Sequence, residues 1–176
     1  MPFWLAALDE ADADVAAVLA LRTPEAVARS LRRRDRLRRA TSLRLWREHV
    51  LAAERATRNL PRAILTFDDL VERPEVQAAR LAATPGFGLR APDEAAQSTI
   101  RRSIRSELVH HDGDHVRRGP FGAKAVVTMA SIYEDLVAHP DGCLPAALTT
   151  ALDELQHAGR VPVWRRTEGP AEARAA

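Results

Sequence analysis

Two short, largely apolar runs differ from the rest of the chain, where apolar residues recur at helical spacing. They cover residues 15–21 (VAAVLAL) and 62–67 (RAILTF), and polar residues or proline bound them. A short apolar run of this kind is typical of a strand buried on both faces of a parallel sheet, although the alanines of the first run also allow a helix. The pattern therefore predicts parallel strands near 15–21 and 62–66.

The remaining pattern predicts helices with recognisable ends. Thr23 is a predicted N-cap, Pro24 the first helical residue and Glu25 a favourable acid in the first turn. Thr41 or Ser42 is expected to start the next helix, and DDLVERP is expected to be a turn. The helix that starts at Thr41 or Ser42 is expected to run up to Asn59. Further helices are predicted at 3–8, 74–84, 93–109, 123–138 and 144–158.

The order strand, helix, helix, strand and then helices predicts a βαβ-type crossover. The predicted fold class is α/β, predominantly helical with few parallel strands. Two strands make a small sheet with exposed apolar edges, and such an edge favours pairing with another chain, including self-association. Residues 1–165 are expected to form one partial domain, and 166–176 a disordered tail.

Composition indicates a soluble protein with a core. The chain has 176 residues, 46% of them hydrophobic, and no apolar run approaches the roughly 18 residues of a membrane span. The start of the sequence lacks the features of a signal peptide. A single cysteine, Cys143, excludes an internal disulfide and fits a reducing compartment, and we expect it to be a small apolar side chain near a loop. The expected location is cytoplasmic.

Charge is unevenly distributed although the net charge is only +2. Seven arginines lie within the eleven residues 29–39. Such a cluster indicates a polyanion or a phosphate group nearby, although a solvated helix and turn is the simpler interpretation. No aromatic residues alternate with the arginines, so we expect no nucleic-acid partner. The cluster consists of Arg29, Arg32, Arg33, Arg34, Arg36, Arg38 and Arg39.

The stretch HHDGDH at 110–115 raises the question of a metal site. Adjacent ligands in a loop can bind zinc weakly, but the sequence offers no fixed helical pair and no distant third ligand. A solvated helix end followed by an Asp-Gly turn is the preferred interpretation. We therefore predict no metal ligands.

Arg22 and Ser30 are the candidate binding residues. Arg22 follows a predicted strand, and Ser30 lies on the helix that starts there. Ligands of open α/β sheets bind at the carboxyl ends of strands beside helix N-termini. A phosphate between the two residues would receive a bidentate guanidinium contact and a hydroxyl donor. The spacing alone also fits a surface arginine and a serine tolerated in a helix.

The segment VLALRTPEAVARSLRRRD resembles the 3′-phosphate-binding segment of sulfotransferases that use PAPS (3′-phosphoadenosine 5′-phosphosulfate). In that family a strand ends in Arg-(Asn/Asp/His)-Pro, and a serine follows eight residues after the arginine. Arg22 and Ser30 match this pattern, whereas Thr23 departs from the usual second residue. The segment RAILTFDDLVERPEVQAARLAATPGFGL resembles a later strand and helix of the family through Phe67-Asp68-Asp69-Leu70 and Pro74.

Three further segments, PFWLAAL, LWREHVLAAERATRNLP and SELVHH, resemble a bacterial branch of the same family. The resemblance covers about residues 2–112. It implies a P-loop-NTPase-like sulfotransferase topology, with Arg22 and Ser30 holding the 3′-phosphate of PAPS or of its product PAP. The implied activity is transfer of a sulfuryl group to a hydroxyl or amine of an unknown small-molecule or glycan acceptor. Phe67 is either a core-edge residue or an aromatic flank for the adenine.

The resemblance also implies that part of the family's machinery lies outside this sequence. The family's glycine-rich 5′-phosphosulfate loop and its usual catalytic base precede the 3′-phosphate segment, and the first glycine here is Gly86. The chain is therefore expected to represent the C-terminal half of such a domain, to contain no catalytic residue and to be inactive alone. RRGPFG at 117–122 either resembles a loop that closes over PAPS or is a basic surface turn. The alternative function is a truncated, non-catalytic remnant or a helical interaction protein with a basic patch.

Overall fold

Strands β1 (Ala17–Leu21) and β2 (Arg62–Thr66) pair in parallel in the computed structural model of the chain. The register places Ala17 opposite Arg62 and Leu21 opposite Thr66. The structure describes residues 2–104 and 123–158, and within them the sheet has these two strands and the rest is mostly helical. The predicted strands and their parallel direction are confirmed, as is the coarse α/β class.

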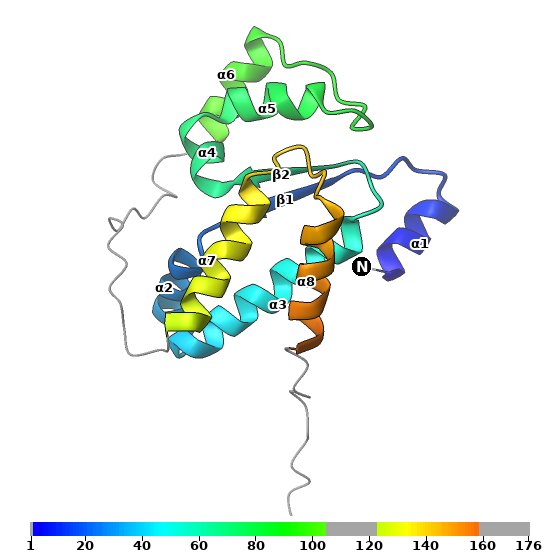
Figure 1. Cartoon of the computed structure of the whole chain (residues 1–176). Helices are drawn as coiled ribbons and strands as arrows, with labels where there is room; N and C mark the ends of the chain where they lie inside the picture. Colours follow the sequence, from blue (N-terminus) through cyan, green and yellow to red (C-terminus); the bar gives the residue numbers. More distant parts are fainter. Residues whose placement is uncertain (1, 105–122, 159–176) are drawn as a thin grey trace, which may run out of the picture.

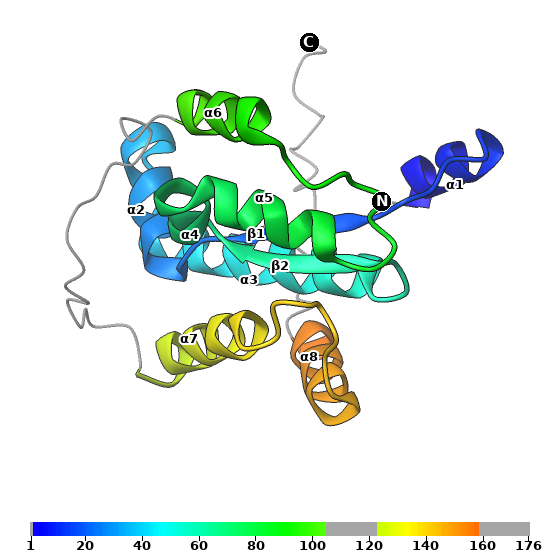
Figure 2. The ribbon, with the colours of Figure 1, turned by 90° about the horizontal axis from the view of Figure 1, so that it is seen from above.

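Helices cover both faces of the sheet. Figures 1 and 2 show α4, α5 and α6 on one face and α2, α3, α7 and α8 on the other, while α1 stands apart beyond the start of β1. The helices are α1 (Pro2–Glu10), α2 (Pro24–Asp35), α3 (Arg39–Thr57), α4 (Phe67–Glu72), α5 (Pro74–Ala83), α6 (Glu94–Ser103), α7 (Ala123–Val137) and α8 (Ala146–Ala158).

Several helix boundaries differ from the predictions by a few residues, and two differences have a structural basis. Helix α3 begins at Arg39, earlier than the predicted Thr41 or Ser42, because extended Arg38 takes the N-cap position without a side-chain cap bond. The segment predicted as a turn after β2 is the short helix α4, because the Thr66 side chain caps it by accepting from the Asp69 backbone N–H.

Several sequence predictions cannot be compared with the structure. Helix α6 starts as predicted, with the Asp93 side chain accepting from Ala96 N–H, and ends at Ser103. The rest of the predicted 93–109 helix, from residue 105 onward, lies outside the described residues. The stretches 110–115, 117–122 and 166–176 also lie outside them.

The hydrophobic core lies between the sheet and the layer of α2, α3, α7 and α8. Trp46 of α3 is 5% exposed and is one of the core residues. Ile132 and Leu136 of α7 are almost completely buried. The core therefore joins the β1–β2 unit to the two closing helices, and its buried members are Leu19, Leu21, Ala28, Leu43, Trp46, Leu51, Ile64, Met129, Ile132, Leu136 and Leu152.

A buried cluster of charged residues joins α3, β2 and α8 at the amino end of β2. Glu54 is fully buried, and Arg62 is 5% exposed. Arg62 Nη1 donates to Glu54 Oε1 at 3.2 Å and to the Glu54 carbonyl at 2.9 Å. Arg58 donates to both carboxylate oxygens of Glu54 and also to Asp153 of α8, and these bonds, the Glu54 bond first, raise the pKa of Arg58. The cluster therefore fixes three elements to one another.

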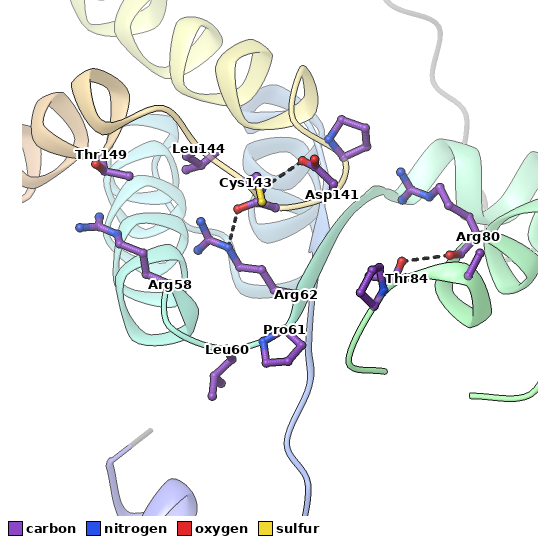
Figure 3. A pocket seen from close by; sticks show the side chains of 14 residues that line it. Arg58, Leu60, Pro61, Arg62, Arg80, Thr84, Asp141, Cys143, Leu144 and Thr149 are labelled. Carbon is purple, nitrogen blue, oxygen red and sulfur yellow. Dashed lines mark hydrogen bonds between the residues drawn. The ribbon is translucent and has the colours of Figure 1, made fainter. Parts of the chain in front are cut away.

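The connection between α7 and α8 closes the outer edge of β2. The Ile64 N–H donates to the Pro140 carbonyl at 2.9 Å, and Arg80 of α5 donates to the Ile64 carbonyl at 2.6 Å. Beside them, the Arg62 Nε–H donates to the Gly142 carbonyl at 2.8 Å (Figure 3). The backbone groups that β2 turns away from β1 at Ile64 are therefore satisfied.

Candidate functional site

The corner between β1 and α2 has the cap that the sequence predicts. The Thr23 side chain accepts from the Ala26 N–H at 3.3 Å, Pro24 is the first helical residue, and Glu25 lies in the first turn. Proline suits this position because its ring fixes a helical φ and it has no N–H to leave unpaired. The start of α2 is therefore fixed immediately after the carboxyl end of β1.

Packing of α3 positions the backbone of Arg22 at this corner. The Trp46 indole N–H donates to the Arg22 carbonyl at 2.9 Å. Arg22 and Phe67 directly follow the register pair Leu21 and Thr66, so both stand at the carboxyl edge of the sheet. There the Arg22 guanidinium lies over the Phe67 ring, 4.7 Å from its centroid, a cation–π contact.

The guanidinium of Arg22 is only partly satisfied. Its Nε is buried and has no hydrogen-bond partner within residues 2–104 and 123–158. Buried donors in folded proteins are nearly always paired, and a guanidinium is best satisfied by a planar or tetrahedral oxyanion. The corner therefore offers an anion an unpaired donor beside an aromatic ring and the start of a helix.

Ser30 lies on the solvent side of α2. Its side chain is exposed, whereas Ala28 of the same helix is 3% exposed and faces the core. No hydrogen bond joins Ser30 to Arg22 in the part of the chain that the structure describes. The structure thus places the two predicted residues on the same strand–helix unit without a direct bond between them.

A cavity of about 330 Å³ lies beside Arg22 and the end of β1. His49 is its second ionisable residue, and its Nδ1 lies 2.8 Å from the Leu45 carbonyl. No pattern along the chain indicates this cavity, because it forms only where α2 packs against α3. Its lining residues are Ala20, Leu21, Arg22, Val27, Leu31, Leu45, Trp46, His49 and Val50.

Thr66 and Asp69 form a reciprocal pair at the β2–α4 corner. The Thr66 hydroxyl donates to Asp69 Oδ2 at 2.7 Å and accepts from the Asp69 N–H at 3.0 Å. Arg73 also donates to this carboxylate. The Thr66 bond first, and then the Arg73 bond, lower the pKa of Asp69 below its ordinary value of 3.8.

The Asp69→Asn variant is expected to be about 0.5–1 kcal/mol less stable than the wild type at neutral pH. A carboxylate whose pKa is lowered by folding stabilises the folded state above its unfolded pKa, and this stabilisation is lost as the pH falls through the folded pKa. The difference between the two proteins should therefore shrink below pH 3.8. Urea unfolding at a series of pH values measures it, with exposed Asp68→Asn as the control, and a difference independent of pH would contradict the assignment.

A larger cavity, of about 720 Å³, lies at the other end of the sheet (Figure 3). Arg58, Arg62 and Arg80 line this cavity. Arg58 and Arg62 belong to the buried cluster, where they are bonded to Asp153 and Glu54. Arg80 donates to the Ile64 carbonyl and keeps a buried Nε without a partner among the described residues. Cys143, which was predicted to be apolar and near a loop, lies exposed at the rim in the α7–α8 connection.

No protein-family model, curated protein or solved structure matches the chain. Within residues 2–104 and 123–158, no helix has both the length and the apolar character needed to cross a membrane. The β1–α2 corner and the motif around Arg22 therefore carry the functional assignment.

Proposed function

We propose that this chain binds the 3′-phosphate of PAPS or PAP at the β1–α2 corner and belongs to a sulfotransferase system of P-loop-like topology. Arg22 supplies the principal charge, Ser30 a hydroxyl donor, and the start of α2 a favourable field for an anion. The acceptor of the sulfuryl group is a hydroxyl or an amine.

The observation that carries the proposal is the buried, unpartnered Nε of Arg22 at the carboxyl edge of parallel strands. An arginine that only filled space there would leave this donor unsatisfied at a cost of about 1–3 kcal/mol. A bound phosphate oxygen removes that cost. The aromatic ring of Phe67 under the guanidinium gives the ligand's adenine an apolar surface within reach of the same site.

The residues present fit the 3′-phosphate part of the donor. When bound, PAPS supplies the activated sulfuryl group, which is transferred in line to the acceptor while PAP departs. Arg22, Ser30 and the capped start of α2 orient the nucleotide and hold its 3′-phosphate, and enzymes of this kind act chiefly by positioning and electrostatic stabilisation. Because no glycine precedes Gly86, we assign binding of the 5′-phosphosulfate to polypeptide other than residues 1–85.

The Arg22→Ala variant is expected to bind PAP about ten- to a hundredfold more weakly than the wild type. Loss of one bidentate, charge-assisted contact corresponds to on the order of 1.5–3 kcal/mol. Isothermal titration calorimetry with PAP, beside adenosine 5′-phosphate, measures the loss and isolates the contribution of the 3′ group. Ser30→Ala should weaken binding by less, because a neutral hydroxyl bond contributes about 0.5–1.5 kcal/mol.

Arg32→Ala is the matched control, because Arg32 is exposed on the last turn of the same helix. Like Arg22→Ala, this substitution removes one positive charge, but from the far end of α2, and it should leave the PAP affinity nearly unchanged. Equal affinity of the wild type for the two nucleotides would overturn the 3′-phosphate site. An equal loss from Arg22→Ala and Arg32→Ala would show that only the general positive field of the helix is involved.

A further inference from the structure

The outer edge of β1 is open. The Ala17 N–H donates to the Pro61 carbonyl, so Ala17, Leu19 and Leu21 direct their backbone groups toward β2. Because successive residues of a strand direct these groups to opposite edges, Val18 and Ala20 direct theirs away from β2. No residue that the structure describes bonds to the backbone of Val18 or Ala20.

The other edge of the same sheet is closed by the chain itself. Pro140 and Arg80 bond the outward N–H and carbonyl of Ile64 on β2. Directly after β1, the Trp46 indole N–H donates to the outward carbonyl of Arg22 and so ends the open stretch. The open segment is therefore a specific site of about three residues, at one edge of the sheet.

Apolar surface accompanies the open edge. Val18 is 44% exposed, and Ala20 is also exposed. The 330 Å³ cavity, lined by Ala20 and Leu21 together with Val27 and Leu31 of α2, runs along the end of the strand. A strand placed against β1 would satisfy the backbone groups and cover this apolar surface at the same time, which is the usual outcome for an open edge.

We propose that the occupant of this edge is β1 of a second copy, paired antiparallel across a two-fold axis. The axis stands perpendicular to the sheet, so the two sheets join into one of four strands in the order β2-β1-β1-β2. Each helical layer then continues on its own side of the joined sheet. Two-fold pairing through one self-complementary patch is the commonest symmetry of soluble dimers.

The open groups fix the register. Val18 of each copy stands opposite Ala20 of the other, and each of these two pairs exchanges both of its N–H···O=C bonds. The two copies of Leu19 then face each other at the axis as a non-hydrogen-bonded pair. This register uses the outward N–H and carbonyl of both Val18 and Ala20.

Charge favours the antiparallel direction. The segment before β1 carries exposed acidic residues, and Arg22 and the arginine-rich α2 follow β1. Antiparallel pairing sets the acidic segment of each copy beside the start of α2 of the other, where the helix dipole is positive. Parallel pairing would set acidic segments side by side. The acidic residues are Asp9, Glu10, Asp12 and Asp14.

The test is the oligomeric state of the full chain by sedimentation equilibrium over about a hundredfold range of concentration. We expect a reversible monomer–dimer equilibrium for the wild type that weakens as salt screens the charges. Val18→Pro should be monomeric throughout that range. It removes an outward N–H that the β1–β2 ladder does not use, and proline is tolerated on edge strands in that orientation. Its circular dichroism spectrum reports whether it folds.

Asp14→Arg is the second variant, and it leaves the strand itself unchanged. Because the substitution acts twice in a symmetric dimer, we expect it to raise the dimer Kd about tenfold at low salt. Glu134→Arg, an equal charge change on exposed α7, should leave the Kd unchanged. A wild type that is monomeric at every concentration would overturn the proposal. So would a Val18→Pro dimer as tight as the wild type, or equal effects of the two charge reversals. All of these measurements are made without nucleotide, so their outcomes are separate from those of the PAP titrations.

Discussion

Replacement of Glu54 by alanine is expected to lower the free energy of unfolding by about 3–5 kcal/mol, because it leaves Arg62 buried and unpaired. Arg62 is 5% exposed, and Glu54 is the carboxylate that it contacts, at 3.2 Å. Arg58 would lose its Glu54 bonds but keep those to Asp153. The main effect is thus that Arg62 loses the negative charge that balances its own.

Glu48→Ala is the matched control on the same helix. Glu48 faces Arg44 one turn away at 3.8 Å, and both side chains are more than a third exposed, at 37% and 46%. Surface pairs of this kind contribute about 0.3–0.5 kcal/mol. Urea unfolding of both variants gives the comparison, and losses of similar size would mean that solvent reaches the Arg62 guanidinium.

Replacement of Gly142 by alanine is expected to destabilise the protein by about 3 kcal/mol or more. Gly142 has φ +75°, and a Cβ there would lie 2.4 Å from Arg62 Cγ and 3.0 Å from the Arg62 carbonyl oxygen. Arg62 cannot move aside without breaking its bonds to Glu54 and to the Gly142 carbonyl. The contact therefore has to be relieved by displacing the α7–α8 connection from β2.

Gly88 separates the steric effect from the backbone effect. It also has a positive φ, +60°, but a Cβ there would meet nothing within 4 Å. Gly88→Ala should therefore cost only the left-handed strain of a non-glycine residue, about 1–2 kcal/mol. Thermal unfolding of both variants measures the difference. If both substitutions lower the thermal midpoint by the same amount, the close approach of Gly142 to Arg62 adds nothing to the cost of the substitution.

Local patterns predicted the sheet and the candidate corner well. The two apolar runs located both strands, but the prediction that both are buried on two faces is wrong for β1, in which Val18 and Ala20 are exposed. Thr23 followed by Pro24 located the start of α2. Parallel strands also imply that Arg22 and Phe67, which follow them, share one edge. The contact between these two side chains depends on rotamers and packing, which residue order does not specify.

The features that the sequence did not reveal depend on residues far apart in the chain. Arg62 is a charged residue at the start of an apolar run, and it is buried because Glu54 and the Gly142 carbonyl satisfy it. Residue spacing contains no information on that pairing. Ser30 illustrates the opposite case. Its position on the helix that follows Arg22 made it a candidate partner, but its exposure depends on which face of α2 packs on the core.

The closure of β2 by Pro140 has a consequence for synthesis on the ribosome. About 70 residues separate the end of β2 from Pro140, and at about 5–20 residues per second their translation takes roughly 4–15 s. During that interval the nascent chain carries both strands but neither α8 nor the segment that bonds Ile64. Both edges of the nascent sheet can then pair with strands of neighbouring nascent chains. Chaperone protection therefore matters most in this interval.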